Sequence, residues 1–308
     1  MDLKQLAYFV RVAELESFTR ASQALNVAQP ALSRQVRQLE VELRRNLLVR
    51  NGRGVSVTDG GALLLAHGRA ILHQVARAHE ELASARGGLA GRVAVGLPPS
   101  VARAYAVPLV RAFRAQLPEA ELSITEALSV ATRDALMAGR LDIAVLYNLR
   151  SADGLDASPL MSEELVLVQA REKNAGAARR TQARRISWKA LAQLPMVIPT
   201  RPNAIRMQME AVLAAEGLGL QIAMEIDGIP AILELVAEGL GAAVLTRHAV
   251  LSAADPAAYT MRALGPSGLH VQAWLATSAQ RPITRTQQAV VDLLRQVMGS
   301  DHSRVDGP

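Results

Sequence analysis

The sequence predicts an α/β protein in which a small helical N-terminal domain is joined by one long helix to two larger lobes of helices and strands. Three observations favour this fold class. Residues 1–58 contain three short stretches whose apolar residues recur at helical spacing. Residues 59–86 keep that spacing without a proline. From Arg92 onward, strand-like and helix-like segments alternate, as is typical of an α/β domain.

The chain length also indicates more than one domain, because 308 residues exceed the usual size of a single one. Three glycines between Gly87 and Gly91 predict a hinge. We therefore expect a helical domain at 1–58, a linker helix and hinge at 59–91, a two-lobed domain at 92–300 and a flexible tail at 301–308. Lobe I should combine 92–162 with 268–300, and lobe II should span 163–267.

The composition excludes several functional classes. Cysteine is absent, which rules out disulfide scaffolds and thiolate metal sites. The sequence shows neither a signal peptide nor an apolar run of about eighteen residues, so we expect a cytoplasmic protein that does not enter the membrane. No phosphate-binding loop, GxGxxG, HExxH or GxSxG motif occurs, and His67, His73 and His79 are spaced six apart, which does not suit a zinc site. We expect no enzyme activity, cofactor or metal.

The helices of the N-terminal domain are predicted one after another from apolar spacing and caps. Leu3, Leu6 and Phe9 begin the first helix. Ser17 can cap a second helix at 18–25. After a tight connection, Pro30 suits the first turn of a third helix. The buried stripe of that third helix is expected to consist of Leu32, Val36, Leu39 and Leu43.

The exposed face of the third helix can donate hydrogen bonds. It carries Gln29, Ser33, Arg34 and Arg37, which suit phosphates or base edges. On an isolated helix such residues are usually no more than solvated surface. Two short helices joined by a three-residue turn, however, are typical of a helix that enters the major groove. The net charge of +6, with nine basic against five acidic residues in the first 58, agrees with duplex DNA as the partner.

Two short strands and a long helix complete this part of the chain. Residues 47–50 and 55–57 flank a glycine-rich turn, which predicts a basic hairpin of the kind called a wing. Thr58 can cap a helix running to about Arg86, and Gly60 and Gly61 predict a flexible start to it. A narrow apolar seam on this helix favours dimerisation over packing against the chain itself. The seam consists of Leu64, Gly68, Ile71, Val75, Ala78 and Leu82.

Several motifs in order along these residues resemble one family. Residues 17–22 (SFTRAS), 28–33 (AQPALS), 39–40 and 47–50 (LLVR) strongly resemble the LysR-type transcriptional regulators. One departure is Ala28, where many relatives have a capping Ser or Thr; its loss costs about 1 kcal/mol of helix stability. The resemblance implies a recognition face and wing made of Gln29, Pro30, Ser33, Arg34, Arg37, Arg50 and Arg53.

The resemblance also implies partners. Like its relatives, the chain is expected to bind promoter operators as a homodimer or homotetramer, to contact RNA polymerase, and to associate with the nucleoid when bound to DNA. Single-stranded nucleic acid is a poorer fit, because only 3% of the residues are aromatic. A solute-binding protein for transport could share the C-terminal fold, but it would not carry the N-terminal domain.

The remaining two hundred residues are predicted to form strands and helices in alternation, with a mostly parallel sheet. Strands are expected at 93–97, 122–125, 142–146, 165–168, 196–198, 222–225 and 242–245, and helices at 101–116, 131–138, 202–216 and 229–238. Residues 91–93, 139–144 and 236–241 match the effector domain of the family, which resembles periplasmic binding proteins in fold. We therefore expect a cleft between two lobes, near the carboxyl ends of strands.

The cleft is expected to bind a small organic anion, most simply a carboxylate. Ser100 with the nearby backbone amides could hold it, although an ordinary helix cap explains that serine equally well. Arg201 and Arg206 could grip it bidentately, unless they are merely surface arginines. By analogy with the family, the effector contacts would be Ser100, Val101, Ser129, Tyr147, Thr200, Arg201, Arg206, Ile226 and Asp227.

Two alternatives stay open. The basic segment 171–185 is either a solvated loop or an auxiliary phosphate contact. Residues 51–55 and 200–202 look most like the nitrogen assimilation control subgroup, some of whose members act without a bound effector. The cleft is therefore either an effector site or an empty remnant of one.

Overall fold

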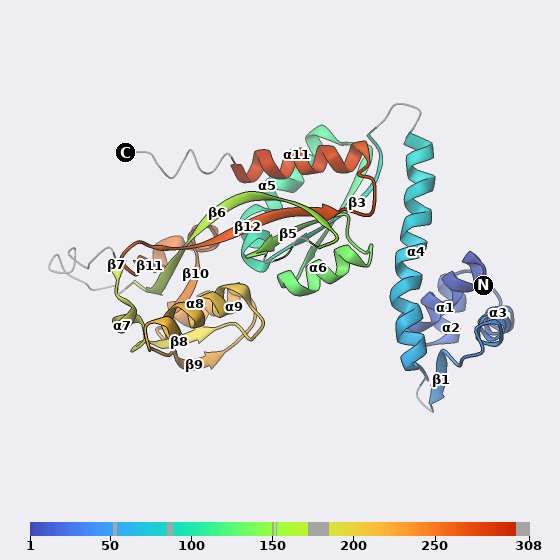
Figure 1. Ribbon diagram of the computed structural model, residues 1–308, viewed down its shortest axis with the longest axis horizontal. Helices are drawn as coiled ribbons and strands as arrows, with labels where there is room; N and C mark the ends of the chain where they lie inside the picture. Colours follow the sequence, from blue (N-terminus) through green and yellow to red (C-terminus); the bar gives the residue numbers. More distant parts are fainter. Residues whose placement is uncertain (52–53, 85–88, 150, 152, 172–184, 300–308) are drawn as a thin grey trace. The chain divides into compact units, whose positions relative to one another are not determined.

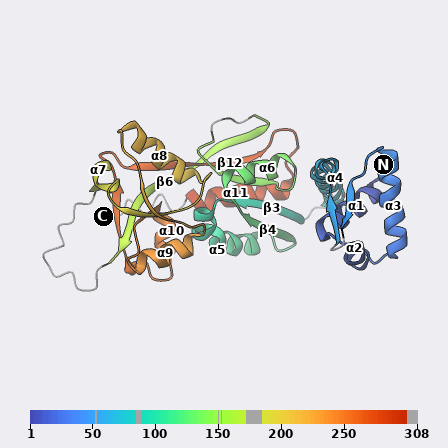
Figure 2. The same ribbon diagram turned by 90° about the horizontal axis from the view of Figure 1, so that it is seen from below.

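The computed structural model describes residues 1–51, 54–84, 89–149, 151, 153–171 and 185–299, and Figures 1 and 2 show it from two directions. The chain divides into two compact units, one formed mainly by residues 1–91 and one almost entirely by the residues from Arg92 onward. The tail at 301–308, most of the basic segment and two of the five residues of the expected hinge lie outside the described residues. The domain boundaries given above stay predictions. No described helix is long and apolar enough to cross a membrane.

The first unit is built on three helices, as predicted. They are α1 (Leu3–Leu15), α2 (Phe18–Ala24) and α3 (Gln29–Glu42). Phe9, Leu32 and Leu39 are fully buried between them. The stripe predicted for α3 is wrong at one end: Leu43 is 38% exposed, because the helix ends at Glu42 and Leu43 is its C-cap residue.

Caps fix where these helices begin. Asp2 and Gln5 form a reciprocal capping box on α1. The Ser17 side chain accepts from the amide of Arg20 at 3.3 Å, which confirms the predicted start of α2. At α3 the N-cap is Ala28, and it provides no side-chain hydrogen bond. Helix α3 therefore lacks the stabilisation that a capping hydroxyl would give.

The predicted hairpin forms from β1 (Leu48–Asn51) and β2 (Gly54–Val57), paired antiparallel. Glu40 on α3 anchors its start, because one carboxylate oxygen accepts from the amides of Leu47 at 2.8 Å and Leu48 at 3.1 Å. The hairpin is thereby held directly to the helix expected to read DNA.

Helix α4 (Asp59–Ser84) follows, and the Thr58 hydroxyl accepts from the amide of Gly61 at 3.0 Å, as a cap should. The expected flexibility of its first turn stays a prediction, but the structure gives Gly61 a role in packing. A Cβ there would lie 2.0 Å from the Leu47 carbonyl oxygen, so glycine is needed for close packing rather than for freedom.

The dimerisation seam predicted on α4 is also partly wrong. Leu64 packs into the core of the first unit, and a Cβ at Gly68 would meet the side chains of Val10 and Leu6 on α1. This half of the seam faces the chain itself, since α1 needs a close partner there. Farther along, Ile71 is 38% exposed and Val75 is half-buried.

The second unit is a mixed α/β domain. Its main sheet has the order β4-β3-β5-β12-β6-β11-β7 with β10 also paired to β6, and β8 and β9 form a small parallel sheet. Its elements are β3 (Gly91–Leu97), α5 (Pro99–Gln116), β4 (Ala120–Glu126), α6 (Ser129–Met137), β5 (Ile143–Tyr147), β6 (Leu155–Ala170), β7 (Arg185–Ile186), α7 (Trp188–Leu191), β8 (Pro195–Ile198), α8 (Ala204–Ala215), β9 (Gln221–Glu225), α9 (Ile229–Ala237), β10 (Ala243–Thr246), α10 (Arg247–Leu251), a short 3-10 turn (Pro256–Ala258), β11 (Tyr259–Leu264), β12 (Leu269–Ser278) and α11 (Arg285–Gly299).

The expectation of a mostly parallel sheet is wrong. Strand β6 pairs antiparallel with β10, β11 and β12, and β12 also pairs antiparallel with β5. The reason is the path of the chain: the long strands β6 and β12 run in opposite directions beside each other through the middle of the domain (Figure 1). The parallel pairs in this sheet include β3 with β5 and the short β7 with β11.

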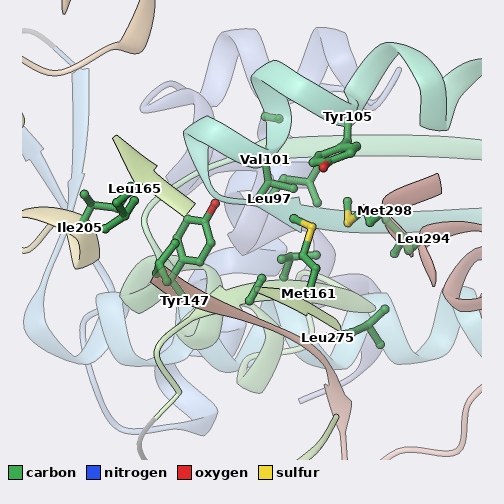
Figure 3. Close-up of a cluster of buried hydrophobic side chains, with 14 of the residues drawn as sticks. Leu97, Val101, Tyr105, Tyr147, Met161, Leu165, Ile205, Leu275, Leu294 and Met298 are labelled. Atoms are coloured by element: carbon green, nitrogen blue, oxygen red, sulfur yellow. The ribbon is translucent and has the colours of Figure 1, made fainter. Parts of the chain in front are cut away.

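Alternate residues of the strands face two different layers. Val93, Val95 and Leu97 lie in the large core with α5 and α11, part of which Figure 3 shows. Gly96 faces α6, where a Cβ would be 2.5 Å from the Thr132 side chain. In the other lobe, α8 packs into this large core and α9 into a second one, and Figure 2 shows these two helices on opposite sides of the strands.

Candidate functional site

The exposed face of α3 is the first candidate site. Gln29, Pro30, Arg34 and Arg37 are exposed and Ser33 is half-buried, while Leu32 on the opposite face anchors the helix in the core. No ion pair within the described part of the chain involves Arg34 or Arg37. Both guanidinium groups are therefore available to an outside anion.

The structure describes less of the wing. Arg50 belongs to β1, so its backbone is fixed by pairing with Val55, but its side chain lies outside the described residues. Arg53 lies outside them altogether. Their roles as backbone or minor-groove contacts stay predictions.

The second candidate site is a cavity of about 250 Å³ in the second unit. Four helices begin at its wall: α5 at Pro99, α6 at Ser129, α8 at Ala204 and α9 at Ile229. The other lining residues are Pro98, Ser100, Glu126, Ala127, Leu128, Tyr147, Pro199, Asn203, Ile205, Asp227, Gly228, Ile232, Val244 and Leu245. Most are apolar, and no described lysine or arginine is among them.

The cavity brings together part of the predicted effector set. Ser100, Ser129, Tyr147 and Asp227 line it. Val101 does not, because its side chain is fully buried in the core beside Tyr105 (Figure 3). The remaining residues of the set, Thr200, Arg201, Arg206 and Ile226, are also not part of the lining.

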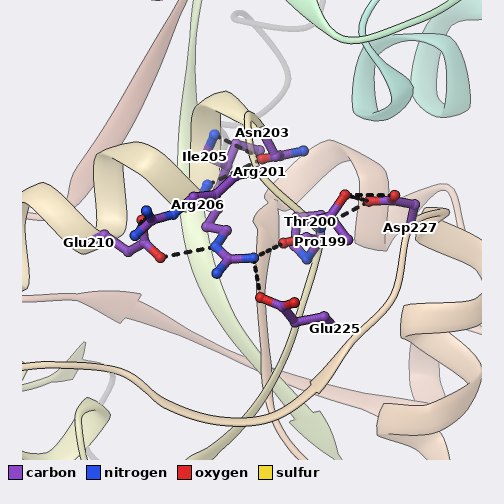
Figure 4. A network of polar contacts seen from close by, with 9 residues as sticks. All are labelled: Pro199, Thr200, Arg201, Asn203, Ile205, Arg206, Glu210, Glu225 and Asp227. Carbon is purple, nitrogen blue, oxygen red and sulfur yellow. Dashed lines mark hydrogen bonds and ion pairs between the residues drawn. The ribbon is translucent and has the colours of Figure 1, made fainter.

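The two arginines are held by carboxylates instead. Arg206 is 6% exposed and bonds the Glu210 carboxylate at 2.9 Å, the Glu225 carboxylate at 2.6 Å and the Pro199 carbonyl at 2.9 Å (Figure 4). Arg201 pairs with Glu210 at 2.8 Å and is 64% exposed. This arrangement joins α8 to β9, and it leaves neither arginine as a free clamp for an anion.

The charges of this cluster stabilise one another. Burial alone would raise the pKa of Glu210, but hydrogen bonds from Arg206 and Arg201 outweigh it and lower that pKa. Burial alone would likewise lower the pKa of Arg206, whereas its bonds to Glu210 and Glu225 raise it. Both shifts favour the ionised forms of Arg206 and Glu210.

Beside this cluster, Thr200 and Asp227 are bonded to each other. The Asp227 carboxylate accepts from the Thr200 amide at 2.9 Å and from the Thr200 hydroxyl at 2.8 and 3.0 Å (Figure 4). Thr200 thus acts behind the cavity, by orienting the carboxylate that lines it.

On the opposite wall, a hydrogen-bonded chain leads from the cavity into the protein. The Ser100 hydroxyl lies 2.8 Å from the Tyr147 hydroxyl, which donates to the carboxylate of Glu163. Glu163 is completely buried, and its second oxygen lies 3.5 Å from Nδ1 of His248. Burial, and then the charge of Glu163, raise the pKa of Tyr147 well above its usual value, so this tyrosine keeps its proton.

Among the residues of this site that sequence reasoning missed are Asn203, Glu126 and Glu163. Asn203 could have been found, because an asparagine after a proline and before an apolar run is a common cap, and here it accepts from the amides of Ile205 and Arg206. Glu126 follows a predicted strand at 122–125, which was also a usable signal. Glu163 carried none, since a glutamate beside Glu164 at the start of an apolar run is normally exposed.

A family model described as "LysR substrate binding domain" matches residues 86–299. A second, described as "Bacterial regulatory helix-turn-helix protein, lysR family", matches residues 3–62. The chain belongs to the LysR family of transcription regulators. It is a DNA-binding regulator with an effector-binding domain, and its relatives are regulators rather than enzymes, which confirms the resemblance predicted from the sequence.

Individual members of the LysR family align along nearly the whole chain. The nitrogen assimilation regulatory protein Nac of Klebsiella aerogenes is 33% identical over 295 residues, which cover 96% of this chain and 94% of that protein. Nac of Escherichia coli strain K12 is 31% identical over 301 residues, or 97% and 96% of the two chains. The crystal structure of full-length CbnR complexed with its target DNA has a TM-score of 0.72 at 20% identity, over 97% of this chain and 99% of that one. That likeness supports the fold.

Proposed function

We propose that this LysR-family regulator reads operator DNA with α3 and the wing, and that a small organic anion in the cavity modulates its activity. One observation carries the effector part: α5 and α9 both begin at the cavity wall without a side-chain cap, because their N-cap residues are Pro98 and Gly228. The first amides of a helix need acceptors, and the helix dipole favours negative charge there. A carboxylate satisfies both requirements.

Backbone amides replace the arginines in this proposal. The sequence prediction placed Arg201 and Arg206 on the anion, but both are bonded to glutamates. Ser129 also fits the role, since its oxygen accepts from the Tyr147 amide at 3.0 Å and its own proton can be donated into the cavity. A single carboxylate on an apolar body suits this mixture of donors and apolar walls.

For DNA, the proposal assigns base contacts to Gln29, Ser33, Arg34 and Arg37, with Pro30 shaping the start of the helix and Arg50 and Arg53 on the backbone or minor groove. The exposure of the α3 face supports this assignment. The neighbour CbnR was crystallised with its target DNA, in the same fold. Direct contact with base edges in the major groove is what α3 would need for sequence specificity.

Assembly as a homodimer or homotetramer, and contact with RNA polymerase, are further parts of the proposal. The exposed apolar residues Leu63 and Ile71 on α4 support self-association, although Leu64 and Gly68 serve the chain's own packing. The paired N-terminal domains of such an assembly would read two half-sites about one or more turns of the DNA helix apart.

The experiment is selection of bound fragments from genomic duplex DNA by the purified protein, repeated with a panel of small organic acids. An enriched interrupted palindrome whose occupancy or footprint changes with one acid supports the proposal. Absence of any enriched sequence at moderate salt contradicts the DNA part, and enrichment that no acid alters contradicts the effector part.

A second candidate function is regulation without an effector. The observation favouring it is that the described lining holds two carboxylates, Glu126 and Asp227, and no basic side chain. A regulator of this kind would be controlled by its own abundance. The acid panel separates the candidates, because no acid should alter operator binding by such a regulator. Filling the cavity by Ser129→Trp should likewise leave its operator binding and transcription unchanged.

A further inference from the structure

The hydrogen-bonded chain at the cavity wall has a fixed direction. Tyr147 has one hydroxyl proton, and it donates that proton to Glu163. The proton in the 2.8 Å contact between Ser100 and Tyr147 must therefore come from Ser100. Because the buried tyrosine keeps its proton, this order is stable.

The consequence for the cavity concerns Ser100. Its hydroxyl proton is used inside the protein, so the oxygen can offer only lone pairs to a ligand. The residue is 3% exposed and lines the cavity, so a ligand that fills the cavity displaces any water that would otherwise donate to it. A ligand that fills the cavity must then bring a hydrogen-bond donor to Ser100, since an unsatisfied buried oxygen is unfavourable.

A second feature points to a positively charged donor. Asp227 and Glu126 line the cavity, and no ion pair of the described residues involves either one. Thr200 holds the Asp227 carboxylate in place with a neutral hydroxyl and an amide. A plain carboxylate ligand would add a third negative charge to this wall without compensating the first two.

The uncapped starts of α5 and α9 favour the opposite charge in the same cavity. One molecule meets both demands only if it carries an anionic and a cationic group. The volume of about 250 Å³ lies near the lower end of ligand pockets, which usually measure about 300–1,000 Å³, so it suits a molecule the size of an amino acid rather than a nucleotide. Leu128, Ile229 and Ile232 provide an apolar wall for its body.

We infer that the cavity selects a small zwitterion, an α-amino acid with an apolar side chain. Its carboxylate lies at the helix starts, and its ammonium group donates to Asp227 and to the lone pairs of Ser100. Asp227 and Ser100 are the residues that determine this specificity. The inference rests on the proposed function, because it names the class of anion that the effector site takes.

The test is calorimetric titration of the full-length protein with matched probes. L-leucine is compared with isocaproate, which lacks the amine, and with isoamylamine, which lacks the carboxylate; L-phenylalanine, hydrocinnamate and phenethylamine form a second set. We expect one amino acid to bind more tightly than both of its partners by about ten-fold or more, as for the loss of one charge-assisted hydrogen bond. Asp227→Asn should weaken the binding of the amino acid to that of its deaminated partner. Asp292→Asn, on an exposed aspartate of α11 outside the lining, should change neither.

The outcomes separate this inference from the proposed function. If isocaproate or hydrocinnamate binds as tightly as its amino acid, the inference is overturned while an anionic effector stands. If only the amines bind, both are overturned. If neither amino acid binds, the inference is overturned, and the broader panel of acids alone decides the proposed function.

Discussion

Replacing Arg206 by methionine should lower the free energy of unfolding of the effector domain markedly. Replacing Arg201 by methionine should lower it little. Arg206 makes three contacts of 2.6 to 2.9 Å while only 6% exposed. Breaking a buried pair costs about 3–5 kcal/mol. Glu225 is 46% and Glu210 21% exposed, so water can rehydrate the carboxylates left behind, and the lower end, about 3 kcal/mol, applies. The ion pair of Arg201 with Glu210 lies at the surface and contributes roughly 0–1 kcal/mol to stability.

The assay uses the two tryptophans of the chain. Trp188 and Trp274 both lie in the second unit, so their fluorescence during urea or thermal unfolding of the full-length protein follows that unit alone. For a domain of about 200 residues, 3 kcal/mol corresponds to a fall in Tm of roughly 6–12 °C. Arg201→Met, the matched control, should lower Tm by no more than about 4 °C.

The reasoning would be refuted by the opposite pattern. If Arg206→Met keeps the wild-type Tm but abolishes the response to the effector, the guanidinium group contacts the ligand, and the sequence prediction of an arginine clamp is right. If both variants fall equally in stability, the difference in exposure does not control the strength of the two pairs.

Three further predictions follow from other parts of the chain. Arg34→Ala should weaken specific operator binding by about 1–3 kcal/mol and non-specific binding less, measured by fluorescence anisotropy on both DNAs; an equal loss would make it a phosphate contact. Ala28→Ser should stabilise α3 by about 1 kcal/mol, seen as slower amide hydrogen exchange in that helix, and unchanged exchange would argue against the missing cap. The lowered pKa of Glu210 contributes stability that is present above its unfolded pKa of about 4.3 and lost as pH falls through the folded value; Glu210→Gln should therefore flatten the acid limb of the tryptophan-detected stability profile, and an unaltered limb would contradict this.

The N-terminal helices and hairpin were predictable because their signals are local. Ser17 and Thr58 cap the helices that follow them, and apolar spacing marks which faces are buried. The predictions fell short where contacts with a distant segment determine the role of a residue. Gly61 and Gly68 are explained by the Leu47 carbonyl and by α1, and neither contact is visible from neighbouring residues.

The cavity was predictable to a similar degree. Ser100, Ser129 and Tyr147 line it because each lies at the end of a strand or the start of the helix after it, and the alternation of elements reveals such places. The spacing of Arg206 and Glu210 is i, i+4, so one of its ion pairs could have been read from the sequence. The second pair, with Glu225, depends on how β9 lies beside α8, which the sequence does not encode locally.

The same long-range pairing explains how the cavity could control the second unit. Tyr147 and Ile205 belong to the large core, whereas Ile229 and Ile232 belong to the second core, and all four line the cavity. A ligand that contacts both lobes can favour one arrangement of them only if it binds that arrangement more tightly. The acceptor at Ser100 and the carboxylate at Asp227 come from different lobes, so a donor that needs both would have the required preference. A carboxylate held by the starts of both α5 and α9 would share this preference, because those helices also belong to different lobes.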